Sequence, residues 1–293
     1  MKFLPQIALA LLLFLAACGA GDEGSQANPT AYIENKGSDT MVNLALAWAE
    51  RYQSGHADVR ISVTGGGSGT GIASLMNGTV DIANASRAMK AEEIESAQAV
   101  GIQPVEIIVA RDAIAVVVHP DNPVSQLTLQ QLSDIYSGRI VNWSEVGGED
   151  RPIVRLSRET NSGTHVYFLE TVLRLGDKEN PTLFSTDTLL LPSSEGIINE
   201  VRQNPNAIGY DGLGYVPDDL KIVAVALSDA GPYVLPMVST VNDKSYPIAR
   251  DLYIYTAGEA SGALRDYIDW ILSEEAQQIV SELGFVPILT ENP

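Results

Sequence analysis

Cysteine and basic side chains are scarce in this sequence. Cys18 is the only cysteine, which excludes a disulfide within the chain. Lys and Arg together number 18 against 37 Asp and Glu, so the formal net charge is −19. We expect no nucleic-acid partner, because nucleic-acid binding needs a basic face. The acidity also repels anions weakly at long range, so any anion would have to be held by local groups.

Histidine is scarce too, and the motifs of common enzyme sites are missing. The three histidines have no metal-ligand spacing, so we expect no metal and no cofactor. We place His56 and His119 in surface turns and His165 on a helix surface. The alternative for His165, which lies in the first turn after a Ser-Gly-Thr sequence, is a position near a ligand. No Lys follows the glycine-rich loops as a P-loop needs, and Thr70 stands where a nucleophile elbow has its second glycine. Without a visible nucleophile or acid–base pair, we expect a protein that is not an enzyme.

The apolar run at the N-terminus, residues 7–17, is too short to span a bilayer as a stable helix. A lysine precedes it and the letters LAAC end it, so we predict a signal peptide over residues 1–17. Small residues before a cysteine resemble the bacterial lipobox, which implies cleavage before Cys18 and its lipidation. The alternative is an ordinary signal peptide with an incidental cysteine. Residues 18–30 have the composition of a flexible tether, so we expect a lipid-anchored protein of the periplasm or cell surface.

The rest of the chain alternates between strand-like and helix-like segments. This pattern predicts an α/β fold with mixed or parallel sheets that helices cover. The apolar run 105–120 predicts one or two buried strands. Residues 41–53 have helical spacing, with Asp39 or Thr40 as the N-cap, and residues 261–283 predict one long amphipathic helix.

Glycine, serine and threonine cluster in three loops that each lie between a predicted strand and a predicted helix. These are GSDTM (37–41), TGGGSGTGI (64–72) and RETNSGTH (158–165), and the last two share a Ser-Gly-Thr core. Unpaired backbone N–H groups at a helix N-terminus, together with hydroxyls, form an anion site that suits phosphate or sulfate. Ligands of such sheets bind at the carboxyl ends of strands, which favours a shared ligand. The alternative is that each loop is only a capped turn.

Two arginines accompany these loops. Arg158 opens the third loop, and Arg87 ends the segment ANASR after another predicted strand. A guanidinium fork matches a tetrahedral oxyanion in a bidentate manner, so both are candidate ligand contacts. The alternative for each is a surface or ion-paired arginine.

An ordered set of short motifs runs through nearly the whole mature chain. The set comprises GSDTM, GGGSGTGI, DIANASR, HPDNP, LTLQQLSDIYSG, VNWSEVGG, RETNSGTHVYF and NAIGY. It resembles that of the phosphate-binding lipoproteins of bacterial high-affinity phosphate ABC transporters, over residues 31–288. This resemblance implies an extracytoplasmic protein that captures inorganic phosphate and delivers it to a membrane permease with an ATPase subunit. We expect it to be a monomer.

The resemblance also implies a two-lobed periplasmic-binding fold of type II, with mixed sheets flanked by helices. A ligand cleft would lie between lobes that close by a hinge. Lobe 1 would comprise residues 31–112 and, after the chain returns, residues 246–293 with a C-terminal helix. Lobe 2 would comprise residues 113–245.

The same resemblance implies the phosphate-binding residues. Lobe 1 would supply Ser38, Thr40, Ser68, Gly69, Thr70 and Ser86, and lobe 2 would supply Arg158, Ser162, Gly163 and Thr164.

One position departs from the family pattern. In the family an aspartate follows the serine after the third strand and accepts the proton of monohydrogen phosphate, whereas this chain has Arg87 there. We take Asp39 as the candidate substitute acceptor, which would repel fully deprotonated sulfate, and Arg87 as a second positive charge. Alternatively, Asp39 only caps a helix.

Other functions remain open from the sequence. The protein could bind another tetrahedral oxyanion, or keep the fold as a phosphate sensor without transport. An enzyme such as a phosphate-ester hydrolase would need a metal cluster or nucleophile that the sequence does not show.

Overall fold

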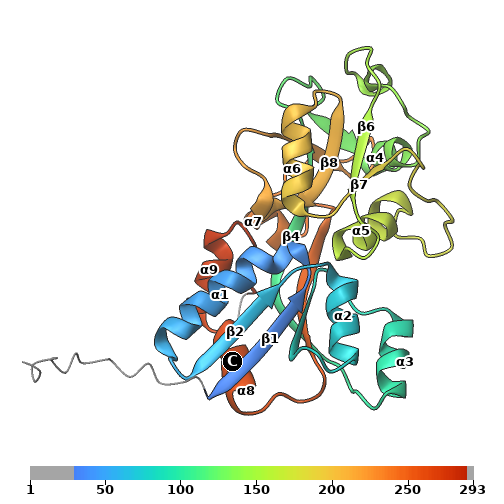
Figure 1. The fold of residues 1–293 in the computed structure, drawn as a ribbon. Coiled ribbons are helices and arrows are strands. Elements are labelled where there is room, and N and C mark those ends of the chain that lie inside the picture. Colours follow the sequence, from blue (N-terminus) through green and yellow to red (C-terminus); the bar gives the residue numbers. More distant parts are fainter. Residues whose placement is uncertain (1–29, 289–293) are drawn as a thin grey trace, which may run out of the picture.

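The computed structural model describes residues 30–288, and they form two lobes joined through long strands (Figure 1). The predicted signal peptide, Cys18 and the predicted tether up to residue 29 lie outside the described residues. Within the described part of the chain, no helix is long and apolar enough to cross a membrane.

Strands and helices alternate along most of the chain, as the sequence predicts. The strands are β1 (Ala31–Gly37), β2 (Val59–Thr64), β3 (Ile82–Ala85), β4 (Val105–Val118), β5 (Gln126–Thr128), β6 (Val154–Arg158), β7 (Leu189–Leu191), β8 (Ala207–Gly212), β9 (Lys221–Ala226) and β10 (Ala249–Thr256). The helices are α1 (Val42–Gly55), α2 (Ser68–Met76), α3 (Ala91–Ala99), α4 (Leu129–Tyr136), α5 (Gly163–Phe168), α6 (Ser194–Gln203), α7 (Val238–Asn242), α8 (Gly262–Ile271) and α9 (Glu274–Glu282).

The sheet is mixed, and its order explains how the lobes connect. The path runs β2-β1-β3-β10-β4-β8-β6-β7, with β9 beside β4 and β5. β1 pairs with β2 and β3 in parallel, whereas β10 is antiparallel to both β3 and β4. Residues 105–113 of β4 pair with β10, and residues 114–118 pair with β8. One unbroken strand thus belongs to both lobes, and we call the β4–β10 pair the crossover strands. The mixed α/β fold is confirmed, whereas the lobe boundaries at 112 and 245 stay predictions.

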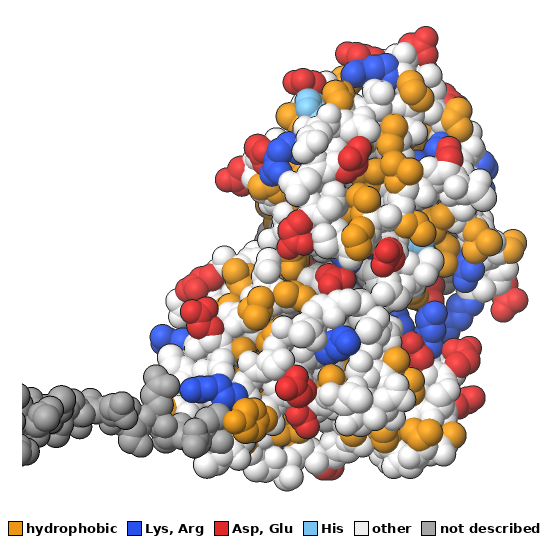
Figure 2. Space-filling view, viewed as in Figure 1, with side chains coloured by type: hydrophobic (Ala, Val, Ile, Leu, Met, Phe, Trp, Pro, Cys, Tyr) orange, Lys and Arg blue, Asp and Glu red, His pale blue; other side chains and the backbone are white. Residues whose placement is uncertain are grey.

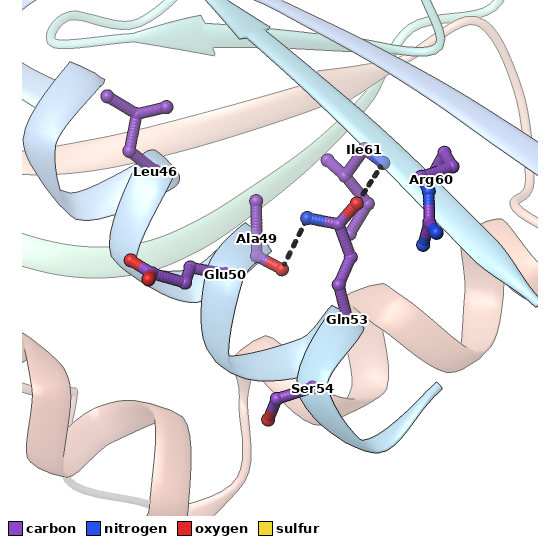
Figure 3. Close-up of a pocket in the computed structure, with 7 residues that line it drawn as sticks. All are labelled: Leu46, Ala49, Glu50, Gln53, Ser54, Arg60 and Ile61. Atoms are coloured by element: carbon purple, nitrogen blue, oxygen red, sulfur yellow. Dashed lines mark hydrogen bonds between the residues drawn. The ribbon is translucent and has the colours of Figure 1, made fainter. Parts of the chain in front are cut away.

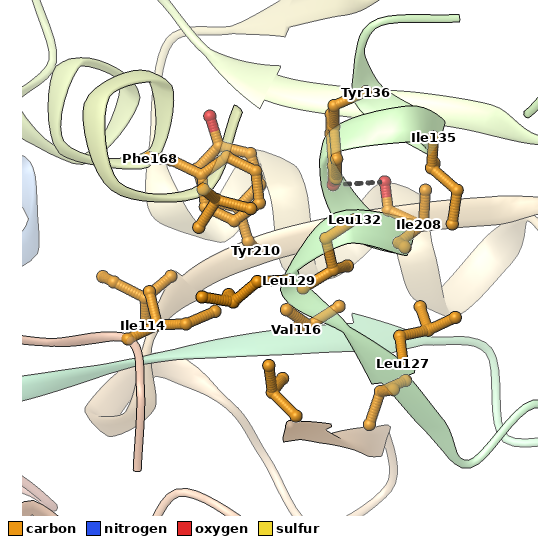
Figure 4. Packing of buried hydrophobic residues seen from close by; sticks show 14 of the residues in the cluster. Ile114, Val116, Leu127, Leu129, Leu132, Ile135, Tyr136, Phe168, Ile208 and Tyr210 are labelled. Atoms are coloured by element: carbon orange, nitrogen blue, oxygen red, sulfur yellow. Dashed lines mark hydrogen bonds between the residues drawn. The ribbon is translucent and has the colours of Figure 1, made fainter. Parts of the chain in front are cut away.

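Each lobe has its own apolar core. In lobe 1, α1, α8 and α9 cover one face of the sheet, and Trp48 and Tyr267 are buried there. In lobe 2, aromatic rings fill the space between α4, α5 and β8 (Figure 4). The rings of Phe168 and Tyr210 are stacked, and the Tyr136 hydroxyl donates to the Ile208 carbonyl at 3.3 Å. These cores hold the loops at the lobe boundary on rigid supports.

Two local predictions are wrong. The segment 261–283 forms two helices rather than one, because the backbone turns at Ser273 and its hydroxyl caps α9 by accepting from the Ala276 N–H. Neither Asp39 nor Thr40 caps α1, since both lie in a 3-10 turn before it and no side chain caps that helix.

A surface pocket of 580 Å³ lies on lobe 1 between α1 and β2 (Figure 3). Gln53 bridges its two walls, donating to the Ala49 carbonyl and accepting from the Ile61 N–H. The lining residues do not include any part of the Gly/Ser/Thr loops.

Candidate functional site

The three Gly/Ser/Thr loops lie together where the lobes meet. GSDTM follows β1, the glycine-rich loop joins β2 to α2, and residues 158–165 join β6 to α5. Figure 1 shows α2 and α5 stacked across the lobe boundary. In the space-filling view the lobes are in contact along a waist, with Lys and Arg side chains gathered at one end of it near α3 (Figure 2).

Asp39 and Arg158 form an ion pair between the lobes. Arg158 Nη2 donates to Asp39 Oδ2 at 2.7 Å, and the Gly66 N–H donates to Asp39 Oδ1 at 2.9 Å. The Arg158 side chain is 1% exposed and also donates to Ser194 Oγ and the Pro192 carbonyl. Asp39 therefore faces Arg158 and the glycine-rich loop, and the alternative that it only caps a helix does not hold.

Two threonines meet across the same boundary. The hydroxyl oxygens of Thr40, from lobe 1, and Thr164, from lobe 2, lie 2.9 Å apart. Both side chains are buried. Arg250 Nη2 donates to each of them, at 3.4 Å to Thr40 and 3.1 Å to Thr164, and also to Asp112 Oδ2 at 2.8 Å.

Three buried serines line the lobe 1 side. Ser38 Oγ donates to Ser86 Oγ at 2.9 Å, and the Ser86 N–H donates to Ser68 Oγ at 3.0 Å. Gly163 of lobe 2 packs directly on this cluster. A Cβ added at Gly163 would lie 2.3 Å from Ser68 Oγ and 2.5 Å from Ser86 Oγ, so only glycine fits while the lobes are in contact.

The glycine-rich loop touches lobe 2 through its backbone. Gly66 and Gly67 have backbone φ angles of +116° and +91°, which residues other than glycine rarely adopt. Asn161 Nδ2 donates to the Gly66 carbonyl at 2.9 Å and to Thr70 Oγ1 at 3.4 Å, while the Gly69 N–H donates to the Asn161 carbonyl at 3.1 Å. The loop is thus held by hydrogen bonds from the opposite lobe.

Ser162 and Arg87 have different surroundings from the residues above. Ser162 is the N-cap of α5 and accepts from the Thr164 N–H at 3.2 Å. Arg87 is 8% exposed, and its two amino groups both donate to the Glu93 carboxylate at 2.7 Å. Burial raises the pKa of Glu93, but the hydrogen bonds from Arg87 and the Lys90 N–H outweigh it, so the pKa is lower than usual. The Arg87 guanidinium is committed to this carboxylate.

The charges at the site are locally balanced. The three arginines at the loops each have a carboxylate partner, in the pairs Arg87–Glu93, Arg158–Asp39 and Arg250–Asp112. A bound anion would therefore rely largely on hydroxyl and backbone N–H dipoles.

Burial raises the pKa of Asp112 to about 6 even though Arg250 opposes the rise, and burial likewise raises the pKa of its neighbour Asp211.

The prediction for His165 is wrong. It is buried behind the site rather than on a helix surface: its Nδ1 lies 3.0 Å from Ser157 Oγ, and its ring stacks on Phe184. Burial lowers its pKa, which keeps it neutral near neutral pH. Among residues 30–288, no group of three or more His, Cys, Asp or Glu is placed to hold a metal ion.

Several residues at the site are not predicted by the sequence analysis. Asn161 lies inside the RETNSGTH motif, and this position was the signal available for it. Arg250 and Asp112 lie in the crossover strands. Charged residues inside otherwise apolar strands were the sequence feature that could have indicated them. Tyr215, whose hydroxyl donates to the Asp39 carbonyl at 2.7 Å, has no sequence signal that we can identify.

Comparisons with known proteins show which family the chain belongs to. Residues 24–275 match the family model of the PBP superfamily domain. The chain is 32% identical to the phosphate-binding protein PstS of Pseudomonas aeruginosa over 87% of its own length and 83% of the relative's. It is also 32% identical to PstS of Bacillus subtilis, over 95% and 91% of the two chains.

Solved structures show the same relationship. One, described as a phosphate ABC transporter substrate-binding protein with bound phosphate from Clostridium perfringens, is 35% identical with a TM-score of 0.78, covering 88% of this chain and 99% of its own. An ABC-type phosphate transport receptor from Vibrio cholerae is 27% identical with a TM-score of 0.70, over 88% and 100% of the two chains. The chain belongs to the PBP superfamily and, within it, to the family of the PstS phosphate-binding proteins.

Proposed function

We propose that this protein captures inorganic phosphate between its two lobes outside the cytoplasm and delivers it to an ABC permease. The observation that carries the proposal is the convergence of three hydroxyl-rich loops and Arg158 at the lobe boundary. The relatives named for phosphate binding support the choice of ligand.

The loops offer many neutral donors to an oxyanion. Ser38, Ser68 and Ser86 bond to one another on lobe 1, and Thr40 bonds to Thr164 across the boundary. A phosphate would exchange these mutual hydrogen bonds for bonds to its own oxygens. Backbone N–H groups at the start of α2 add further donors.

Positive charge would come chiefly from Arg158. Its guanidinium is buried, and it already links the lobes through Asp39. Arg87 also stays a proposed contributor, but its amino groups face Glu93, so it would act mainly through its field.

Lobe closure would be part of binding. The donors of lobe 1 and those of lobe 2 can engage one ligand only when the loops are in contact, so the ligand favours the closed arrangement.

Asp39 is the proposed acceptor for the proton of monohydrogen phosphate. Its two oxygens each accept one hydrogen bond from the protein, and a carboxylate oxygen has room for a second. Sulfate has no proton to donate and would face the carboxylate charge, so it would bind poorly.

Two further parts of the proposal concern the molecule beyond its site. We propose that the protein catalyses no reaction, which fits a substrate-binding family. We also propose that a lipid on Cys18 anchors it at the membrane surface.

Isothermal titration of the soluble chain from residue 28 onward, freed of bound ligand, tests the function. Phosphate and sulfate are titrated separately at pH 6 and pH 8. We expect tight phosphate binding and little sulfate binding. Equal binding of both anions would favour a general oxyanion site, and no heat with either would refute the proposal.

The Asp39→Asn variant tests the acceptor. A hydrogen bond to a charged group contributes about 2 kcal/mol, so phosphate should bind roughly 30-fold more weakly. Because the variant also weakens the pair with Arg158, the decisive quantity is the ratio of phosphate to sulfate affinity, which should fall. Asp58→Asn removes one exposed carboxylate from lobe 1 and is the matched control.

A further inference from the structure

The two crossover strands carry the same three letters, Ala-Arg-Asp, at the place where they pair. β4 has them at 110–112 and β10 at 249–251, and the strands are antiparallel with Arg250 opposite Asp112 and Asp251 opposite Arg111. The result is two reciprocal arginine–aspartate pairs on opposite faces. The Arg111–Asp251 pair is partly exposed at 3.3 Å, whereas the side chains of Arg250 and Asp112 are 2% and 0% exposed.

The buried pair is in contact with both lobes. Arg250 Nε and Nη2 both donate to Asp112 Oδ2, at 3.2 and 2.8 Å, which fixes the guanidinium on the crossover strands. Nη2 also lies within hydrogen-bond distance of Thr40 Oγ1 in lobe 1 and Thr164 Oγ1 in lobe 2. One cationic group therefore joins the crossover strands to a loop of each lobe.

This arrangement determines how the threonine hydroxyls can act. A guanidinium can only donate, so it occupies lone pairs of the two oxygens and leaves their O–H groups as donors. One hydroxyl donates to the other, and the remaining proton is free for a third group. A hydroxyl that accepts from a cation is also a stronger donor, because hydrogen bonds polarise one another. The pair is thus arranged to donate to an anion.

Two more observations indicate that Arg250 does more than hold β4 and β10 together. Arg250 Nη1 is buried and has no hydrogen-bond partner among the described residues, which is costly for a group that serves only to hold strands together. The guanidinium also lies 5.6 Å from the centre of the Tyr167 ring of α5, a further contact with lobe 2.

We infer that Arg250 is a positioning residue of the phosphate site, held by Asp112 on the crossover strands, that orients Thr40 and Thr164 as donors when the lobes are closed. The inference rests on the proposed function. It predicts that Arg250 acts on ligand affinity through the threonine hydroxyls, and that it slows ligand release more than it speeds capture.

A double-mutant cycle tests this inference. Phosphate affinity is measured at pH 8, where Asp112 is ionised, for wild type, Arg250→Lys, Thr164→Val and the double variant. We expect Arg250→Lys to weaken phosphate binding about 10-fold in the wild-type background, because lysine keeps the charge but loses the fork. In the Thr164→Val background the same change should cost less than about 3-fold, since residues that act through one another are not additive.

Stopped-flow kinetics and a matched control complete the test. The loss in Arg250→Lys should appear in the dissociation rate, because encounter with the open lobes does not involve this residue. Arg111→Lys changes the reciprocal pair on the exposed face and should leave both rates as in wild type. If Arg250→Lys does not fold, Asp112→Asn, which keeps the side-chain shape, takes its place with the same expected dependence on Thr164.

The possible outcomes distinguish a failure of the proposed function from a failure of the inference about Arg250. If wild type does not bind phosphate, the proposed function fails. If wild type binds but Arg250→Lys binds equally well, or loses the same factor in both backgrounds, the inference about Arg250 is refuted while the function stands. A loss of thermal stability with unchanged affinity would also refute it, since that is the signature of a purely structural pair.

Discussion

Gly163 packs against the buried serines of lobe 1, so adding one methyl group at this position tests whether phosphate binding requires the lobes to close. In Gly163→Ala the new Cβ would lie 2.3 Å from Ser68 Oγ and 2.5 Å from Ser86 Oγ, about 1 Å closer than an ordinary contact. Both serines are held by hydrogen bonds, to each other here and to phosphate oxygens in the proposed complex, so they cannot move aside without losing them. The substitution therefore acts against the closed arrangement and leaves each lobe intact.

The magnitude follows from the crowding. Overpacking typically costs about 1–3 kcal/mol, and turning a serine away forfeits hydrogen bonds of about 1 kcal/mol each. A total of about 3 kcal/mol against closure corresponds to roughly 150-fold weaker phosphate binding. The ligand-free protein should melt close to wild type, because alanine favours a helix more than glycine does.

Titration calorimetry, thermal unfolding with and without phosphate, and small-angle scattering measure these effects. Phosphate should raise the melting temperature of wild type by mass action but hardly that of Gly163→Ala, whose particle should stay more extended. Gly55→Ala, at a glycine with no atom within 4 Å of the added Cβ, is the control and should bind as wild type. Unchanged phosphate affinity in Gly163→Ala would refute closure onto the serine cluster.

Three other predictions concern the lobe 2 core, the crossover strands and the proposed lipid anchor. Leu132→Ala, in the lobe 2 core, should lower the free energy of unfolding by about 2–5 kcal/mol without changing phosphate affinity, as urea unfolding and titration would show. Burial raises the pKa of Asp112 from 3.8 to about 6, so the folded state keeps its proton to higher pH than the unfolded state. That stability is fully present below about pH 4 and is lost as pH rises through about 6, by at most about 3 kcal/mol. Asp112→Asn should flatten this loss in urea unfolding between pH 4 and 7, and an unchanged slope would contradict the assignment. Cys18→Ser should release the protein from the membrane fraction of cells; continued membrane attachment would argue against lipidation there.

The fold and the meeting of the loops were predictable for a physical reason. Apolar runs alternating with helical spacing predict a sheet covered by helices, and the carboxyl ends of parallel strands lie at one edge. The loops after β1, β2 and β3 therefore had to be neighbours. Loop 158–165 follows β6, and the resemblance placed it on the opposite lobe, where it faces them.

The remaining features depend on tertiary contacts that local patterns do not encode. The break between α8 and α9 depends on Ser273, which caps α9. The spacing of apolar residues does not indicate it, because that spacing continues through both helices. His165 is buried because lobe 2 packs Phe184 against its ring. The pairing of Arg87 with Glu93, and that of Arg250 with Asp112, required knowing which side chains the backbone brings together.

If phosphate binds where the three loops meet, a crystal structure of the protein with phosphate will show it there. We expect phosphate oxygens within hydrogen-bond distance of the hydroxyls of Ser38, Ser68, Ser86 and Thr164 and of the Arg158 guanidinium. Phosphate bound elsewhere, such as in the pocket between α1 and β2, with these hydroxyls still bonded to one another, would contradict it.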